Sequence, residues 1–160
     1  MPFIESLDTP AIHFLLQAGV AFKIFHHLSK IQSLRQAAEE RGQATDQIVR
    51  SILFRLSTGD FVMVLMAGES QISWKSLRAY LGERRLTLAA PQDVLEQTGY
   101  EIGAVTPFGL PRSLRILANP SVFVYPEISL GSGKKGYAIL IQPGLLKTLI
   151  ENLEIAPLTE

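Results

Sequence analysis

The stretch "QIVRSILFRLSTGDFVMVLMA", residues 47–67, determines the fold predicted for this chain. It contains two apolar runs, 47–56 and 61–67, separated by the short turn "STGD". Two apolar runs around a short glycine-containing turn are typical of a β-hairpin. We therefore predict a β-hairpin over residues 47–67.

One charged residue interrupts the first run. Arg50 lies in a strand that is otherwise apolar on both sides, where an arginine is costly unless its guanidinium is paired or reaches a cleft. The alternative is an edge or outward position from which the side chain extends to solvent. The residues alone favour the two interpretations equally.

Helix signals flank the hairpin on both sides. Capping residues and glycine stops predict helices from Thr9-Pro10 to Gly19, Ser33 to Gly42, Ser73 to Gly82 and Ala90-Pro91 to Gly99, with a last helix from Pro143 through "GLLKTLIENL". Further strands are predicted at 20–27, 85–89, 113–118, 121–126 and 137–142, with a loop at 129–136. Hairpins mixed with isolated helices indicate an α+β fold or a mixed sheet, in one domain over 1–160.

Composition excludes several classes of site. The chain has no cysteine, so disulfides, thiolate catalysis and cysteine-bound metals are excluded. Fifteen basic residues balance fifteen acidic ones, so no broad phosphate-binding surface is indicated. We expect no signal peptide and no membrane span, and we expect the protein in the cytoplasm.

The histidines do not form a metal-binding pattern. His26 and His27 are adjacent on a predicted strand and so project to opposite faces. There is no HExxH spacing, and we expect neither a metal nor another cofactor.

Two glycine-rich stretches remain unexplained by ordinary structure. "TGYEIGAVTPFGLP", residues 98–111, is too apolar for a surface linker and too interrupted for a helix or central strand. "GSGKKG", residues 131–136, could hold an anion with its backbone N–H groups, or could be a flexible loop with two solvated lysines.

Taken in order, these segments are similar to a known family. "TPAIHFLLQAGVAFKIFHH", "TDQIVRSILFRL", "LGERRLTLAAP", "TGYEIGAVTPFG" and "GSGKKGYAILIQP" together resemble the YbaK/EbsC family over roughly residues 8–150. The same domain is inserted in bacterial prolyl-tRNA synthetases as an editing module. The resemblance implies a mixed, curved, barrel-like β-sheet surrounded by helices. It also implies an aminoacyl-tRNA deacylase that hydrolyses mischarged, tRNA(Pro)-like substrates carrying a small amino acid.

The resemblance also implies a set of site residues. Arg50 and Ser51 fall where the family has a lysine followed by threonine, serine or asparagine, and are the candidate catalytic residues. Arginine keeps the positive charge but does not lose its proton at working pH. The candidate substrate-binding residues are His27, Gly103, Thr106, Pro107, Phe108, Gly109, Gly131, Ser132, Gly133 and Lys134.

Three functions remain open at this point. The first is trans-editing deacylation at the acceptor end of an aminoacyl-tRNA, with a prolyl-tRNA synthetase as a candidate partner. The second is a non-catalytic module that binds a small molecule or a tRNA end and has lost the family lysine. The third is an interaction domain using apolar segments such as "FVMVLM" and "LLKTLI".

Overall fold

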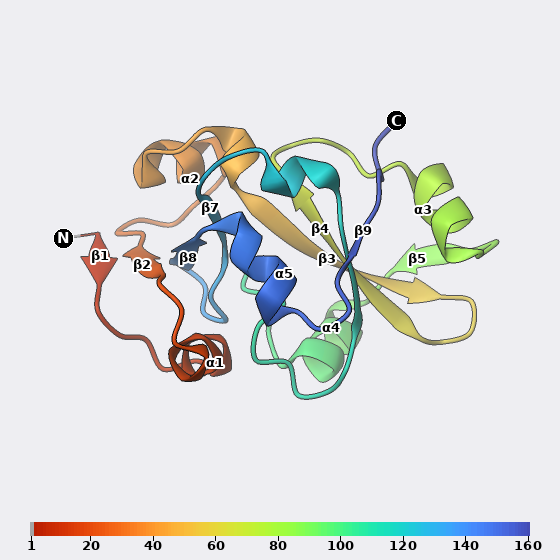
Figure 1. The fold of residues 1–160 in the computed structure, drawn as a ribbon, viewed down its shortest axis with the longest axis horizontal. Helices are drawn as coiled ribbons and strands as arrows, with labels where there is room; N and C mark the ends of the chain where they lie inside the picture. Colours follow the sequence, from red (N-terminus) through yellow and green to blue (C-terminus); the bar gives the residue numbers. More distant parts are fainter. Residues whose placement is uncertain (1) are drawn as a thin grey trace.

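The protein is built from two β-sheets with helices packed around them (Figure 1). The computed structural model describes residues 2–160. Figure 1 shows α1 and α2 flanking the four-stranded sheet, and α3 at the far end of the five-stranded sheet. The helices are α1 (Pro10–Ala18), α2 (Leu34–Arg41), α3 (Trp74–Leu81), α4 (Pro91–Thr98) and α5 (Leu146–Leu149), with 3-10 turns at Thr45–Gln47, Pro120–Phe123 and Pro143–Leu145.

The predicted hairpin is confirmed and forms the centre of the larger sheet. Strands β3 (Val49–Leu56) and β4 (Phe61–Ala67) pair antiparallel, with Arg55 opposite Phe61 next to the turn. Both faces of β4 are covered, since Met63 and Leu65 pack in one hydrophobic cluster while its alternate residues pack in another. Burial on both faces explains why this strand is a continuous apolar run rather than an alternating one.

The five-stranded sheet is mixed. Its order is β5-β3-β4-β6-β9, where the remaining strands are β5 (Leu86–Leu88), β6 (Arg115–Ala118) and β9 (Glu154–Ile155). β5 joins β3 antiparallel, whereas β6 and β9 continue from β4 in parallel.

The second sheet is antiparallel and shares the main hydrophobic core with the first. Its order is β1-β2-β8-β7, from β1 (Phe3–Ile4), β2 (Lys23–His26), β8 (Tyr137–Ile141) and β7 (Ile128–Gly131). Among residues 2–160, one isolated bridge, from Ile48 just before β3 to Ser129 in β7, joins the two sheets. The α+β prediction is confirmed, but the sheets are not closed into a barrel.

Local sequence sets the ends of the first helices, as predicted. The side chains of Thr9, Ser33 and Ser73 each accept a backbone N–H at the start of α1, α2 and α3. The following glycines, Gly19, Gly42, Gly82 and Gly99, all close their helices in the left-handed conformation. No helix within residues 2–160 has both the length and the apolar character needed to cross a bilayer.

Three predictions for the C-terminal third were wrong. The segment 121–126 is not a strand: Pro120, which lacks the N–H that a strand would need, opens a 3-10 turn through Phe123. The predicted loop 129–136 begins instead as strand β7, because Ser129 and Gly131 pair with β8. The last helix ends at Leu149, where the chain becomes extended and buries Ile150 in the core.

Candidate functional site

A cavity of about 320 Å³ lies where β3 and β7 separate beyond their single bridge. We call it the β3–β7 cavity. Its lining residues come from five segments of the chain. They are His27, Ile31, Arg41, Ile48, Val49, Arg50, Ser51, Gly103, Val105, Leu130, Gly131, Gly136 and Tyr137. Of the predicted site residues, it therefore brings together His27, Arg50, Ser51, Gly103 and Gly131.

The two glycine-rich segments meet at this cavity. A Cβ on Gly131 would overlap the carbonyl oxygen of Val105, so only glycine allows the backbones to approach this closely. The N–H of Gly133 donates to the carbonyl of Ala104 at 3.0 Å. The backbone N–H groups of Gly103 and Val105 make no hydrogen bond within residues 2–160, so they remain available as donors in the cavity wall.

Arg50 directs its guanidinium to the other side of the strand. Side chains alternate along β3, so Arg50 and Ser51 project to opposite faces. A terminal nitrogen of Arg50 donates to the carbonyl of Ser70, while Nε is buried without a partner in residues 2–160. Burial lowers the pKa of Arg50, and Glu69 partly opposes that effect. Arg50 thus contributes to the cavity wall while its charged group is bonded elsewhere.

Ser51 occupies the wall between two hollows. Its hydroxyl is buried and has no hydrogen-bond partner in the described part of the chain. An apolar hollow of about 230 Å³, which includes Leu53 and Val94, shares Ser51, Gly103 and Val105 with the β3–β7 cavity. A buried hydroxyl without a partner is costly, and a ligand or water at this junction would satisfy it.

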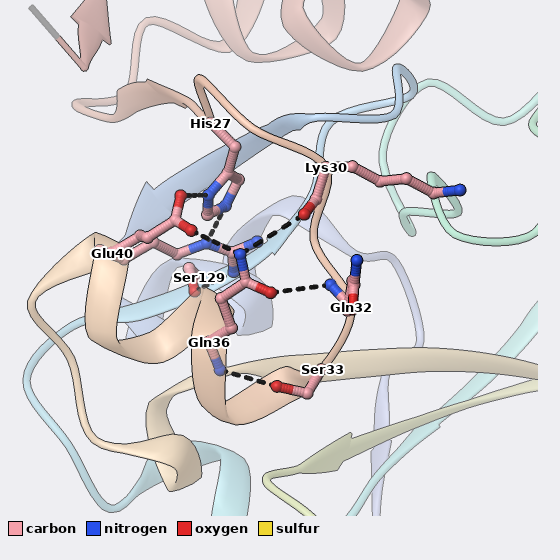
Figure 2. Close-up of polar contacts among 8 residues, drawn as sticks. His27, Lys30, Gln32, Ser33, Gln36, Glu40 and Ser129 are labelled. Atoms are coloured by element: carbon pink, nitrogen blue, oxygen red, sulfur yellow. Dashed lines mark hydrogen bonds and ion pairs between the residues drawn. The ribbon is translucent and has the colours of Figure 1, made fainter.

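A partly buried cluster of charged and polar side chains lies at another wall, which His27 and Arg41 line (Figure 2). His27 Nδ1 donates to Glu40 Oε1 at 2.8 Å, and Arg41 Nε donates to His27 Nε2 at 3.0 Å. Arg41 also donates from Nη1 to Ser129 Oγ at 2.8 Å. Ser129 is fully buried, and its hydroxyl donates a hydrogen bond to Gln43 Oε1 at 2.7 Å.

This arrangement fixes the protonation state of His27. Because arginine can only donate, Nε2 must carry a lone pair, and the proton must be on Nδ1, facing Glu40. Burial lowers the pKa of His27, Arg41 lowers it further, and the hydrogen bond to Glu40 opposes them. His27 therefore serves here as a neutral acceptor that orients Arg41.

Arg41 stays charged despite its position. Burial lowers its pKa to about 10, with the nearby carboxylate of Glu40 acting in the opposite direction. Hydrogen bonds from His27, and then from Gln36 Nε2 at 2.9 Å, lower the pKa of Glu40. At neutral pH the cluster consists of an arginine cation, a glutamate anion and a neutral histidine between them.

Other predicted site residues lie outside the cavity lining. Thr106, Pro107 and Phe108 are buried in the core, where the Phe108 ring stacks on Phe14 and its carbonyl accepts from Tyr100 at 2.6 Å. Gly109 packs against the backbone at the start of α1. The remaining three, Ser132, Gly133 and Lys134, form the turn between β7 and β8. Their roles in substrate binding stay predictions.

Arg41 is the functional candidate that sequence reasoning missed. An arginine in the last turn of a helix, just before a glycine stop, is ordinarily read as a solvated residue that complements the helix dipole. Nothing in the local sequence indicates that this helix end packs against β2 and β7. Within residues 2–160, no group of three or more histidine, aspartate or glutamate side chains could hold a metal ion.

Comparison with known proteins identifies the family. The family model of the aminoacyl-tRNA editing domain matches residues 29–149. A proline–tRNA ligase of Thermosipho melanesiensis is 31% identical over 111 residues, which are 69% of this chain but only 19% of the ligase. The multifunctional Ser/Thr-tRNA deacylase ProXp-y of Escherichia coli is 26% identical over 135 residues, covering 82% of this chain and 80% of that protein.

A solved structure agrees with these relatives. A protein assigned as a trans-editing enzyme for prolyl-tRNA synthetase superposes with a TM-score of 0.86 at 26% identity, covering 97% of this chain and 99% of its own. Since the family model spans well over half of the sequence, this chain belongs to the aminoacyl-tRNA editing domain family.

Proposed function

We propose that this protein is an aminoacyl-tRNA deacylase of the trans-editing type. Its substrate would be a mischarged, tRNA(Pro)-like aminoacyl-tRNA that carries a small amino acid. The protein would act on this substrate in the cytoplasm. The observation that carries the proposal is the β3–β7 cavity, where two glycine-rich segments meet beside the unpartnered hydroxyl of Ser51. Family membership and the named activity of the ProXp-y relative support it.

The chemistry required is ester hydrolysis. The oxygen of a water molecule bonds to the ester carbonyl carbon, and the carbonyl oxygen gains negative charge. The bond to the ribose oxygen then breaks, and that oxygen takes up the proton released by the attacking water. Backbone N–H groups of Gly103 and Val105 are suitably free to stabilise the developing oxyanion. Ser51 Oγ is available to hold the water or the ribose hydroxyl of the terminal nucleotide.

The test is a panel of charged tRNAs. The protein is incubated with tRNA(Pro) charged with alanine or cysteine, and with other aminoacyl-tRNAs, and the loss of the ester is followed over time. We expect hydrolysis by the native protein and a clear loss in Ser51→Ala, which removes the unpartnered hydroxyl from the cavity wall. Activity across the panel no greater than that of Ser51→Ala would overturn the proposal. Repeating the assay with a prolyl-tRNA synthetase present tests whether that partner raises the rate.

A second candidate is a binding module without catalysis. The observation that favours it is the bond from Arg50 to the Ser70 carbonyl, which keeps the guanidinium away from the cavity. If Arg50→Lys creates hydrolysis that the native protein lacks, this second function is supported. If Arg50→Lys lowers an activity already present in the native protein, it is excluded.

A further inference from the structure

We propose that Arg41 makes the β3–β7 cavity select aminoacyl groups whose side chain carries an oxygen acceptor, such as a hydroxyl, over apolar groups of the same shape. This inference rests on the proposed function, because it assumes that the aminoacyl group enters this cavity. It assigns a specificity-determining role to a residue at the end of α2.

The guanidinium of Arg41 is fixed but only partly used. Of its five N–H groups, one is donated to His27 Nε2 and one to Ser129 Oγ. The other three have no acceptor among residues 2–160. His27 is 5% exposed and Ser129 is fully buried, so both anchors are held by the surrounding core. Figure 2 labels both anchors, His27 and Ser129.

The rest of the wall beside Arg41 is apolar. Ile31, Ile48 and Leu130 line the same cavity. The other arginine of the lining, Arg50, has its guanidinium bonded to Ser70. Among the described lining residues, Arg41 is the arginine whose guanidinium is oriented by two side-chain acceptors, His27 and Ser129.

The unused donors produce an asymmetry between substrates. In the free protein, water satisfies them. An apolar side chain placed there would displace that water and leave charged N–H groups unpaired, which costs free energy. A hydroxyl of the same size would replace the lost acceptor. Sites built around such donors reject an analogue that lacks the acceptor far more strongly than they reject a difference of one methylene.

Threonine and valine give the sharpest test, because their side chains have nearly the same shape and differ by a hydroxyl in place of a methyl. Deacylation rates are compared for one tRNA charged with threonine or valine, and then with serine or alanine. We expect the native protein to prefer threonine over valine by at least about tenfold. In Arg41→Met the preference should disappear, while Arg41→Lys should retain part of it.

Two further variants separate specificity from stability. Arg35→Met removes an exposed arginine from the same helix and should leave the threonine-to-valine ratio unchanged. Ser129→Ala removes one anchor of Arg41 without altering a cavity-lining residue, and should reduce the ratio through poorer orientation. If Arg41→Met fails to fold by circular dichroism, Ser129→Ala and Arg41→Lys carry the test.

Binding measurements keep this inference distinct from the proposed function. Calorimetry with non-hydrolysable 3′-amide analogues of threonyl- and valyl-adenosine measures selection without chemistry. Tighter binding of the threonyl analogue, lost in Arg41→Met, supports the inference even if no tRNA is hydrolysed. If threonyl- and valyl-tRNA are hydrolysed at equal rates and the two analogues bind equally, the inference is overturned and the deacylase proposal still stands. A ratio unchanged in Arg41→Met also overturns it.

Discussion

At the scale of single residues, the most informative feature is the hydrogen bond between an arginine, which is always charged, and a histidine, which is charged only when protonated. Arg41 donates to His27 Nε2 at 3.0 Å, which is possible only if the imidazole is neutral. Burial of His27 favours the same state. Protonating His27 would place an N–H against an N–H and would break the support of Arg41.

This leads to a prediction about pH. Because the folded-state pKa of His27 lies below its ordinary value of 6.5, the unfolded chain binds that proton more readily. His27 therefore contributes stability that is complete above pH 6.5 and is lost as the pH falls below it. The loss cannot exceed about 1.4 kcal/mol per pH unit for one group. Urea unfolding at pH 7.5 and 5.5 should show a larger loss for the native protein than for His27→Gln.

An NMR titration gives an independent check. The His27 ring should titrate below pH 6.5 in the native protein, and its pKa should rise in Arg41→Met, where the neighbouring positive charge is gone. Equal stability losses in the native protein and His27→Gln, together with an unchanged pKa in Arg41→Met, would contradict this account. Strongly acidic pH is avoided, because Glu40, whose pKa the hydrogen bond from His27 holds below its usual value, also gains its proton there.

At the scale of elements, α1 is tied to the turn after β7 by its own N-cap. Thr9 Oγ1 accepts the N–H of Ile12 at 3.3 Å and donates to the carbonyl of Ser132 at 2.7 Å. One hydroxyl thus caps a helix and holds a segment 123 residues later in the chain. Ser33 caps α2 in the same way, but within the described residues it makes no comparable long-range bond.

The pair of caps gives a matched prediction. Thr9→Ala should lower the free energy of unfolding by about 1–2 kcal/mol, and Ser33→Ala by about 0.5–1 kcal/mol, because only Thr9 also satisfies a buried carbonyl. Thr9→Ser should recover most of the loss. Hydrogen exchange in residues 131–136 should increase in Thr9→Ala and stay constant in Ser33→Ala. Equal effects of the two alanine variants on stability and exchange would show that the long-range bond is unimportant.

At the scale of the whole molecule, the cavity depends on how closely two distant segments approach. Gly131 ends β7 against the backbone of Val105, and no side chain fits between them. Gly136, five residues later, has a φ of 86° but open space around it. The two glycines therefore differ in kind: one is required by close approach and the other by backbone conformation.

Alanine at each position separates these two causes. Gly131→Ala should lower the free energy of unfolding by about 2 kcal/mol or more, because the backbones must move apart. Gly136→Ala should cost about 1 kcal/mol from its left-handed backbone alone. Any deacylation should fall sharply in Gly131→Ala, which reshapes the cavity. Thermal or urea unfolding measures the difference, and a larger loss in Gly136→Ala would contradict the assignment.

The sequence by itself determined the local features of this protein. Apolar patterning placed the hairpin of β3 and β4, and the caps and glycine stops placed α1 to α4, because these signals act between neighbours in the chain. Two segments were predicted wrongly. Pro120 opens a 3-10 turn where a strand was expected at 121–126, and β7 forms in part of the expected loop because it pairs with the next strand, β8.

Only the tertiary structure decided the geometry of the site. The direction of Arg50 and the assembly of Arg41, His27 and Ser129 depend on contacts between segments as far as 88 residues apart. Arg41 looks like a solvated helix-end residue in the sequence. It becomes a half-buried, oriented cation because the end of α2 lies beside β7 and the residue that follows β2, where Ser129 and His27 offer acceptors in place of water.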